Sequence, residues 1–241
     1  MSGLAQVQDP SRRRFLKSLL VIAGAATIAG ALPSLRYLVP PAVGLSSFPT
    51  LLLVDSSGNP IKASSLPVNS PQTFQFSYPL TNEPNFLLNL GDDSGNPVEI
   101  PPVDVVIPAT GEKYTAPGGV GPHKSIVAYS AICQHLGCKY PELHFYPPGY
   151  TAQTFNGPMS KVIHCSCHGS TYDPYQGGKV VTGPTQYPLP AVVLQWDPTT
   201  DQLYATRMVG PVIYGHASDL QGGSPPSGDT TVVEDVGNPF G

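Results

Sequence analysis

Cys133-Gln134-His135-Leu136-Gly137-Cys138 and Cys165-Ser166-Cys167-His168-Gly169-Ser170 decide the fold, because these two boxes contain all four cysteines of the chain. They also hold two of its six histidines. Thiolate and imidazole together select zinc or iron–sulfur clusters, whereas metals that prefer carboxylate ligands would not choose this set. The spacing alone leaves open a zinc site, an iron–sulfur cluster and two unrelated disulfides.

The two boxes resemble the cluster motifs of the Rieske family, in which two Cys bind one iron of a [2Fe–2S] cluster and two His bind the other. The resemblance implies four ligands, namely Cys133, His135, Cys165 and His168. Cys138 and Cys167 are then left over, and in respiratory Rieske proteins the equivalent residues form a disulfide between the cluster loops. We therefore expect a [2Fe–2S] cofactor and one disulfide.

Two hydroxyl residues, one that ends the second box and one just after it, strengthen the resemblance to respiratory members. Ser170 and Tyr172 stand where Rieske proteins of high potential donate hydrogen bonds to a cluster sulfide and to a ligand sulfur. Such donors stabilise the reduced, more negative cluster and raise its potential. Further on, Gly183–Pro190 resembles the proline loop that covers the cluster, although it departs from the usual Gly-Pro-Ala-Pro form.

The N-terminus predicts export and membrane attachment. Ser11-Arg12-Arg13-Arg14-Phe15-Leu16-Lys17 matches the twin-arginine pattern, so residues 1–17 are expected to stay in the cytoplasm. The uncharged run Ser18–Leu35 would span about 27 Å as a helix, close to the ~30 Å hydrocarbon core. We predict an uncleaved transmembrane anchor over 18–39 and a tether over 40–47, while Pro33 and Ala29-Gly30-Ala31 leave cleavage open.

Composition predicts an all-β exported domain. Charged residues make up 12% of the chain, while 29 Pro and 25 Gly favour loops and short strands. From Tyr37 onward, 7 basic and 15 acidic residues give a net charge of −8, which makes nucleic acid a poor partner. We expect strands at 50–55, 73–80, 86–90, 98–107 and 124–132, and a hairpin that joins 191–196 to 202–208.

The expected architecture is a Rieske-type antiparallel β-sandwich base fold with an inserted cluster-binding subdomain, plus one N-terminal transmembrane helix. The Rieske domain should cover 48–217, with the subdomain at about 126–190, and a flexible acidic tail should follow over 218–241. The 26 residues between Cys138 and Cys165 read as a surface insertion, similar to that of long-loop archaeal Rieske proteins.

The resemblance implies an electron-transfer subunit of a quinol-oxidising complex, held at the cell membrane with its Rieske domain on the extracytoplasmic side. It would take one electron from quinol, beside a cytochrome b-type membrane subunit, and pass it to a cytochrome or blue-copper protein. His135 or His168 would accept the hydrogen bond and the proton of the quinol. Two alternatives are the small Rieske subunit of an arsenite-oxidase-type enzyme and a zinc-stabilised exported binding module without electron transfer.

Overall fold

The computed structural model describes residues 48–212, 223–224 and 226–241. The predicted export motif, anchor and tether lie outside these residues, and so does part of the predicted tail. Within the described part, no helix is long and apolar enough to cross a membrane. The prediction of an N-terminal transmembrane helix therefore stays a prediction.

The described residues form an all-β structure of fifteen strands, with two short 3₁₀ helices, η2 (Ala63–Ser65) and η3 (Pro174–Gln176). Seven strands close into a barrel, in the spatial order β1 (Leu51–Val54), β14 (Gln202–Val209), β13 (Ala191–Asp197), β6 (Ile126–Ser130), β3 (Pro84–Asn89), β2 (Phe74–Ser77) and β15 (Thr230–Asp235). A second sheet has the order β12 (Lys179–Thr182), β11 (Thr171–Asp173), β10 (Val162–Cys165) and β7 (Leu143–Tyr146). Two hairpins complete the fold, β4 (Val103–Val106) with β5 (Lys113–Ala116), and β8 (Ala152–Thr154) with β9 (Gly157–Met159).

The base is a closed barrel rather than the predicted antiparallel sandwich. Strand β15 pairs in parallel with β1 and antiparallel with β2, and these two ladders join the ends of the sheet. Closure removes the two open edges that a sandwich would leave unpaired. The alternation of apolar and polar residues along one strand predicts which side chains face inward. It does not predict which strand pairs with each edge, because the pairing strands lie far apart in sequence.

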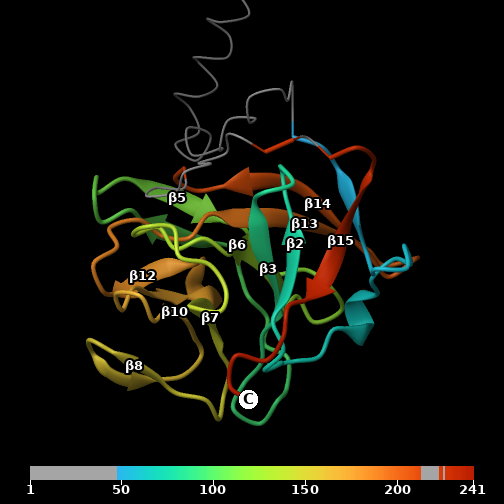
Figure 1. Ribbon diagram of the computed structural model, residues 1–241. Helices are drawn as coiled ribbons and strands as arrows, with labels where there is room; N and C mark the ends of the chain where they lie inside the picture. The colour runs from blue at the N-terminus through green and yellow to red at the C-terminus, as the bar shows by residue number, and fades with distance from the viewer. Residues whose placement is uncertain (1–47, 213–222, 225) are drawn as a thin grey trace, which may run out of the picture. The chain divides into compact units, whose positions relative to one another are not determined.

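The flexible tail predicted over 218–241 is wrong for its last part. Thr230–Asp235 form β15, which Figure 1 draws beside β2. Polar and small residues suggested disorder, yet Thr231 and Val233 alternate with exposed neighbours and are themselves buried. A half-buried strand of this kind needs only every second side chain to be buried.

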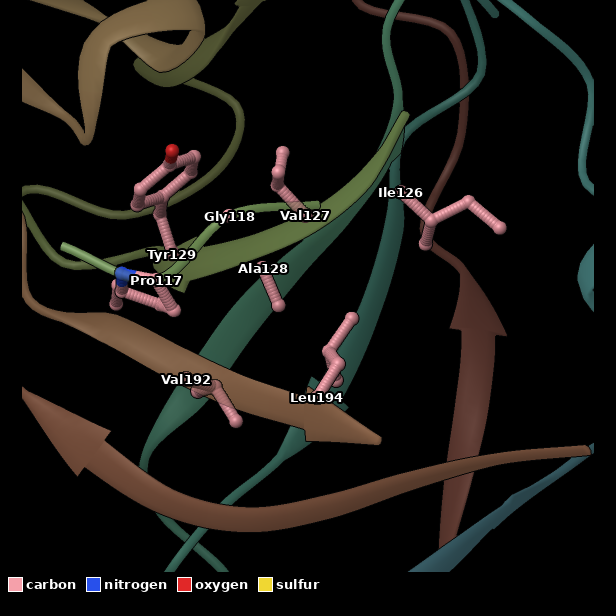
Figure 2. Close-up of a pocket in the computed structure, with 9 residues that line it drawn as sticks. Pro117, Gly118, Ile126, Val127, Ala128, Tyr129, Val192 and Leu194 are labelled. Carbon is pink, nitrogen blue, oxygen red and sulfur yellow. The ribbon is translucent and has the colours of Figure 1, made fainter. Parts of the chain in front are cut away.

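Strand β6 lies between two hydrophobic cores of the domain, and all five of its residues are buried. Ile126 and Ala128 belong to the barrel core, together with Val192 and Leu194 of β13. Figure 2 shows Ala128 on one side of the strand and Val127 and Tyr129 on the other. The space among the residues in this view leaves no room for a water molecule, so it is packed core and no ligand cavity.

The opposite face of β6 packs against the sheet that carries the second cysteine box. Val127 and Tyr129 share a second core with Phe145 of β7, Ile163 of β10 and Tyr172 of β11. The insertion between the boxes thus supplies β7 and most of β10, as well as the β8–β9 hairpin. The predicted subdomain boundary at residue 126 lies too early, because β6 is a barrel strand.

Candidate metal centre

The two cysteine boxes fold into equivalent tight loops. In the first box Cys133 donates its backbone N–H to Cys138 O at 2.8 Å, and Gly137 donates to Cys133 O at 2.9 Å. In the second box Cys165 and Gly169 make the corresponding bonds, to Ser170 O and to Cys165 O, both at 2.9 Å. Gly137 and Gly169 have φ values of +80° and +86°, which a residue with a Cβ adopts only with strain. The repeated turn places Cys133 and Cys165 at matching positions, whereas His135 is the third residue of its box and His168 the fourth.

The disulfide predicted between Cys138 and Cys167 is present and joins the two loops. The Cys165 sulfur lies within 4.8 Å of both bridged sulfurs. Because the disulfide consumes two of these three sulfur atoms, only Cys165 in this group retains a thiol that can bind metal. Cys133 is the other free cysteine of the described residues.

Cys133 and Cys165 are each 1% exposed, and their thiols interact. A hydrogen bond from the Cys165 thiol lowers the pKa of Cys133, and the Tyr172 hydroxyl contributes in the same direction. The same bond, together with burial, raises the pKa of Cys165. The opposite shifts disfavour two thiolates side by side, so a bound metal would be needed to hold both sulfurs as thiolates.

His135 and His168 lie beside this sulfur pair. Their ring centroids are 4.9 Å apart, with the ring planes at 81° to each other. Nδ1 of His135 is buried and has no hydrogen-bond partner in the described structure. His168 is exposed and His135 is half-buried, so the histidine pair reaches the surface while the cysteine pair does not.

The two hydroxyl residues, Ser170 and Tyr172, lie near the Cys133 sulfur. Tyr172 Oη lies 3.3 Å from Cys133 Sγ and accepts the backbone N–H of Gln134 at 3.0 Å. Burial raises the pKa of Tyr172, which keeps the phenol protonated. The Ser170 hydroxyl adds to the lowering of the Cys133 pKa, although its buried oxygen makes no hydrogen bond of normal geometry.

The loop that resembles a proline loop lies against the second box. A Cβ added to Gly183 would stand 2.5 Å from Gly169 O and 2.6 Å from the Cα of Ser170, so only glycine permits this approach. Thr185, two residues on, is 1% exposed and lies close enough to Tyr172 to lower the pKa of its hydroxyl. The loop therefore covers the hydroxyl residues and excludes water from them.

The residues present fit a [2Fe–2S] cluster. Two buried free thiols face each other, and a buried imidazole nitrogen and a buried serine hydroxyl beside them lack partners that a cluster would supply. A buried polar atom without a partner is unfavourable by about 1–3 kcal/mol, and a cluster bound through Nδ1 of His135 would give that atom a partner.

Sequence reasoning missed three contributors to this site. Gln134 acts through its backbone N–H, Thr185 through its contact with Tyr172, and Phe155 through a ring that lies against Gly169. Because every residue except proline has a backbone N–H, the residue type at position 134 does not reveal this donor. The positions of Thr185 and Phe155 result from tertiary packing, so no local pattern marks them.

Comparison with known proteins identifies the domain. The family model for the Rieske [2Fe-2S] domain matches residues 93–193. The iodate reductase subunit IdrB of Denitromonas iodatirespirans is 28% identical over 161 residues, which are 67% of this chain and 66% of that protein. The cytochrome b6-f complex iron-sulfur subunit 1 of a Synechocystis species is 29% identical over 195 residues, 80% of this chain and 83% of the relative.

A third relative matches the region of the two boxes. The cytochrome bc1 complex Rieske iron-sulfur subunit of Streptomyces lividans is 38% identical over 68 residues, 28% of this chain and 32% of that subunit. The family match decides against the zinc alternative, because the cofactor of this domain is an iron–sulfur cluster. The chain therefore contains a Rieske [2Fe-2S] domain, and the cofactor of this domain is a [2Fe–2S] cluster.

Proposed function

We propose that this protein is a membrane-tethered Rieske subunit that takes one electron from a quinol and passes it to a cytochrome or blue-copper protein. The observation that carries the proposal is the surface position of His135 and His168 beside the buried Cys133 and Cys165. A substrate can reach the imidazoles, while the sulfur atoms are protected from solvent. The relatives named as cytochrome b6-f and bc1 subunits support the same assignment.

The four ligands are assigned to Cys133, His135, Cys165 and His168. When bound, the [2Fe–2S] cluster accepts and releases one electron. His135 directs Nδ1 inward, so Nε2 is the ring nitrogen left for a substrate. This nitrogen would accept the hydrogen bond of a quinol hydroxyl and then its proton, so that proton and electron leave the quinol together.

Tyr172 and Ser170 are assigned as donors to sulfur. The Tyr172 oxygen already accepts the Gln134 N–H, and its own proton is therefore free to point at Cys133 Sγ. Donation to a ligand sulfur favours the reduced form, and we expect a positive potential in the upper part of the Rieske range of about −150 to +300 mV.

The membrane assignment rests on the sequence of the N-terminus. Arg12, Arg13, Arg14 and Lys17 before the uncharged run would stay in the cytoplasm, leaving the Rieske domain outside. Full-length protein should remain in the membrane pellet after an alkaline carbonate wash. Release into the supernatant would contradict the anchor without affecting the redox assignment.

Quinol oxidation is tested on the full-length holoprotein in native membranes. Addition of a short-chain quinol should produce the electron paramagnetic resonance signal of the reduced cluster. The potential should be independent of pH in acid and should fall by about 59 mV per pH unit where one proton accompanies each electron. A potential independent of pH up to strongly alkaline conditions would contradict proton coupling at a histidine.

The relative named as an iodate reductase subunit favours a second candidate, the small Rieske subunit of an oxyanion oxidoreductase, which includes the arsenite-oxidase type. Purification from native membranes under mild conditions separates the two candidates. Co-purification of b-type haem supports the quinol-oxidising complex. A molybdenum-containing partner without haem b supports the oxyanion enzyme instead.

A further inference from the structure

The side chain of Gln134 is buried between two assigned ligands of the first box. Gln134 lies between Cys133 and His135 in the chain, and it is 2% exposed. Glutamine is mostly found in contact with water, and burial of an amide is unfavourable unless the amide is hydrogen-bonded. Nε2 of Gln134 donates to Val212 O at 3.2 Å, across 78 residues of sequence. A flipped amide would place Oε1 against the Val212 carbonyl oxygen, so this bond fixes the orientation of the side chain.

Val212 belongs to a packed segment, residues 209–212, at the end of β14. Gly210 and Pro211 are buried, and Val212 is half-buried. A Cβ added to Gly210 would stand 3.1 Å from the Cα of Pro190, the last residue of the loop that resembles a proline loop. The ring of Pro211 adds rigidity, because it fixes φ at about −65°. The segment therefore offers the Gln134 amide a partner whose position is fixed by the base of the fold.

The backbone of Gln134 contacts the tyrosine beside the sulfur pair. The Gln134 N–H donates to Tyr172 Oη at 3.0 Å, and this oxygen lies 3.3 Å from Cys133 Sγ. A hydroxyl that accepts a hydrogen bond becomes a stronger donor, because hydrogen bonds in a chain polarise one another. One residue thus bonds through its side chain to the end of β14 and through its backbone to the phenol.

We propose that Gln134 is a positioning residue of the redox site, whose side chain, held by Val212 O, keeps the Gln134 N–H on Tyr172 Oη. The inference rests on one part of the proposed function, the donation from Tyr172 to the Cys133 sulfur. It is independent of the electron donor and of the acceptor. Gln134 acts through Tyr172, so the end of β14 takes part in setting the potential.

The first test is a redox titration of holoprotein carrying Gln134→Met, followed by electron paramagnetic resonance. Methionine keeps an unbranched side chain of similar length and removes the donor to Val212 O. The N–H at position 134 should then leave the phenol for part of the time, which weakens donation to sulfur. At a fixed solution potential the ratio of reduced to oxidised cluster should fall about threefold, a potential lower by about 28 mV at 59 mV per tenfold. An unchanged or higher potential would overturn the proposal.

Asn89→Leu is the matched control, because Asn89 Nδ2 donates to Leu66 O at 2.8 Å in the base of the fold. This variant also loses an amide-to-carbonyl bond, and its potential should match that of the native protein. A fall equal to that of Gln134→Met would mean that general loosening of the fold lowers the potential, which contradicts a specific role of Gln134.

A double variant separates positioning through Tyr172 from a merely structural role. Gln134→Met added to Tyr172→Phe should leave the potential of Tyr172→Phe unchanged, because the phenol through which Gln134 acts is already gone. A further fall of about the same size in the double variant would show that Gln134 acts by another route and would reject the proposal.

Hydrogen exchange, followed by mass spectrometry on oxidised holoprotein, gives a readout without a redox measurement. Gln134→Met should speed exchange of the N–H at position 134 roughly tenfold. The Gly137 N–H, which donates to Cys133 O at 2.9 Å in the same box, should keep its native rate. Unchanged exchange at position 134, or equal acceleration at Gly137, would overturn the proposal. An unchanged potential in Tyr172→Phe would instead reject that part of the proposed function, and exchange at position 134 would still decide whether the side chain holds its backbone.

Discussion

The hydroxyl oxygen of Tyr172 lies 3.3 Å from Cys133 Sγ, and the same oxygen accepts the backbone N–H of Gln134 at 3.0 Å. Tyr172 is on β11, whereas Cys133 and Gln134 belong to the first box, so this contact joins the two halves of the site. The backbone donor orients the phenol, because it occupies one lone pair and leaves the phenolic proton to point at the sulfur. A deprotonated Cys133 sulfur can only accept, so the Tyr172 hydroxyl would donate to it when Cys133 is a metal ligand.

Tyr172→Phe should lower the reduction potential and leave the cluster assembled. A hydrogen bond that favours one oxidation state by about 1 kcal/mol corresponds to roughly 40 mV for one electron. Ser170→Ala should act in the same direction. The measurement is a redox titration of the holoprotein followed by electron paramagnetic resonance.

Tyr78→Phe is the control for loss of a buried hydroxyl, since Tyr78 donates to Pro49 O at 2.8 Å in the base of the fold. Its potential should match that of the native protein. Unchanged potentials in both Tyr172→Phe and Ser170→Ala would show that neither hydroxyl donates to sulfur.

Replacing Cys138 and Cys167 together with Ser should yield a protein that still assembles its cluster but loses it sooner on heating. The chain-entropy model gives about 3–4 kcal/mol for a loop closed over 29 residues. The loss in holoprotein should be smaller, because ligands in both boxes would already tie the loops together. The reduction potential should also be lower, because without the disulfide the loops no longer hold the hydrogen-bond donors in place beside the sulfur atoms. Cluster lifetime on heating is the measurement, and an unchanged lifetime would refute the role of the bridge.

Phe240→Ala should destabilise the fold by about 2 kcal/mol, because the C-terminal segment closes over the insertion. The Phe240 ring stacks on Tyr150 at a centroid distance of 4.0 Å and meets Tyr146 and His144 edge-on at 5.2 and 5.1 Å. Thermal unfolding should shift down by roughly 5 °C. Phe155→Ala makes the same chemical change at a side chain that is 72% exposed, and its transition should stay near the native one. Equal shifts in the two variants would argue against this packing role.

Acid should weaken the base of the fold through Asp201. The Ser64 hydroxyl and the Trp196 indole N–H donate to its carboxylate at 2.6 and 2.9 Å, and the Ser64 bond is the largest cause of its lowered pKa. Because the folded pKa lies below the unfolded value of about 3.8, this stabilisation is complete above that pH and is lost as pH falls through the folded pKa.

Asp201→Asn should therefore lose less thermal stability than the native protein when the pH is lowered from 5 to 2. Ser64→Ala removes the largest cause of the shift and should flatten the curve in the same way. Thermal unfolding across this pH range is the measurement. A curve for Asp201→Asn that runs parallel to the native curve would exclude Asp201 as the source.

The resemblance of the two cysteine boxes to the Rieske family predicted the [2Fe–2S] cofactor from the sequence, and the family match confirms it. Cys and His are rare and chemically specific, and their spacing within a tight loop is a local property. Through the family resemblance, Cys133, His135, Cys165 and His168 could be named as candidate ligands without a structure, and this assignment stays a prediction. The disulfide between Cys138 and Cys167 followed from the family resemblance and is confirmed. The all-β class and the β13–β14 hairpin followed from strand alternation and from turn residues.

Only the tertiary structure decided how distant segments meet. Thr230–Asp235 close the barrel because β1 and β2 would otherwise leave unpaired edges. The residues of this segment do not show by themselves which edges they pair with. Phe155 lies against Gly169 because the β8–β9 hairpin folds back toward the second box. Tyr172 lies next to Cys133 because β11 packs beside the first box. Local chemistry is encoded by neighbouring residues, whereas long-range pairing depends on the sum of many weak contacts that form only in the folded chain.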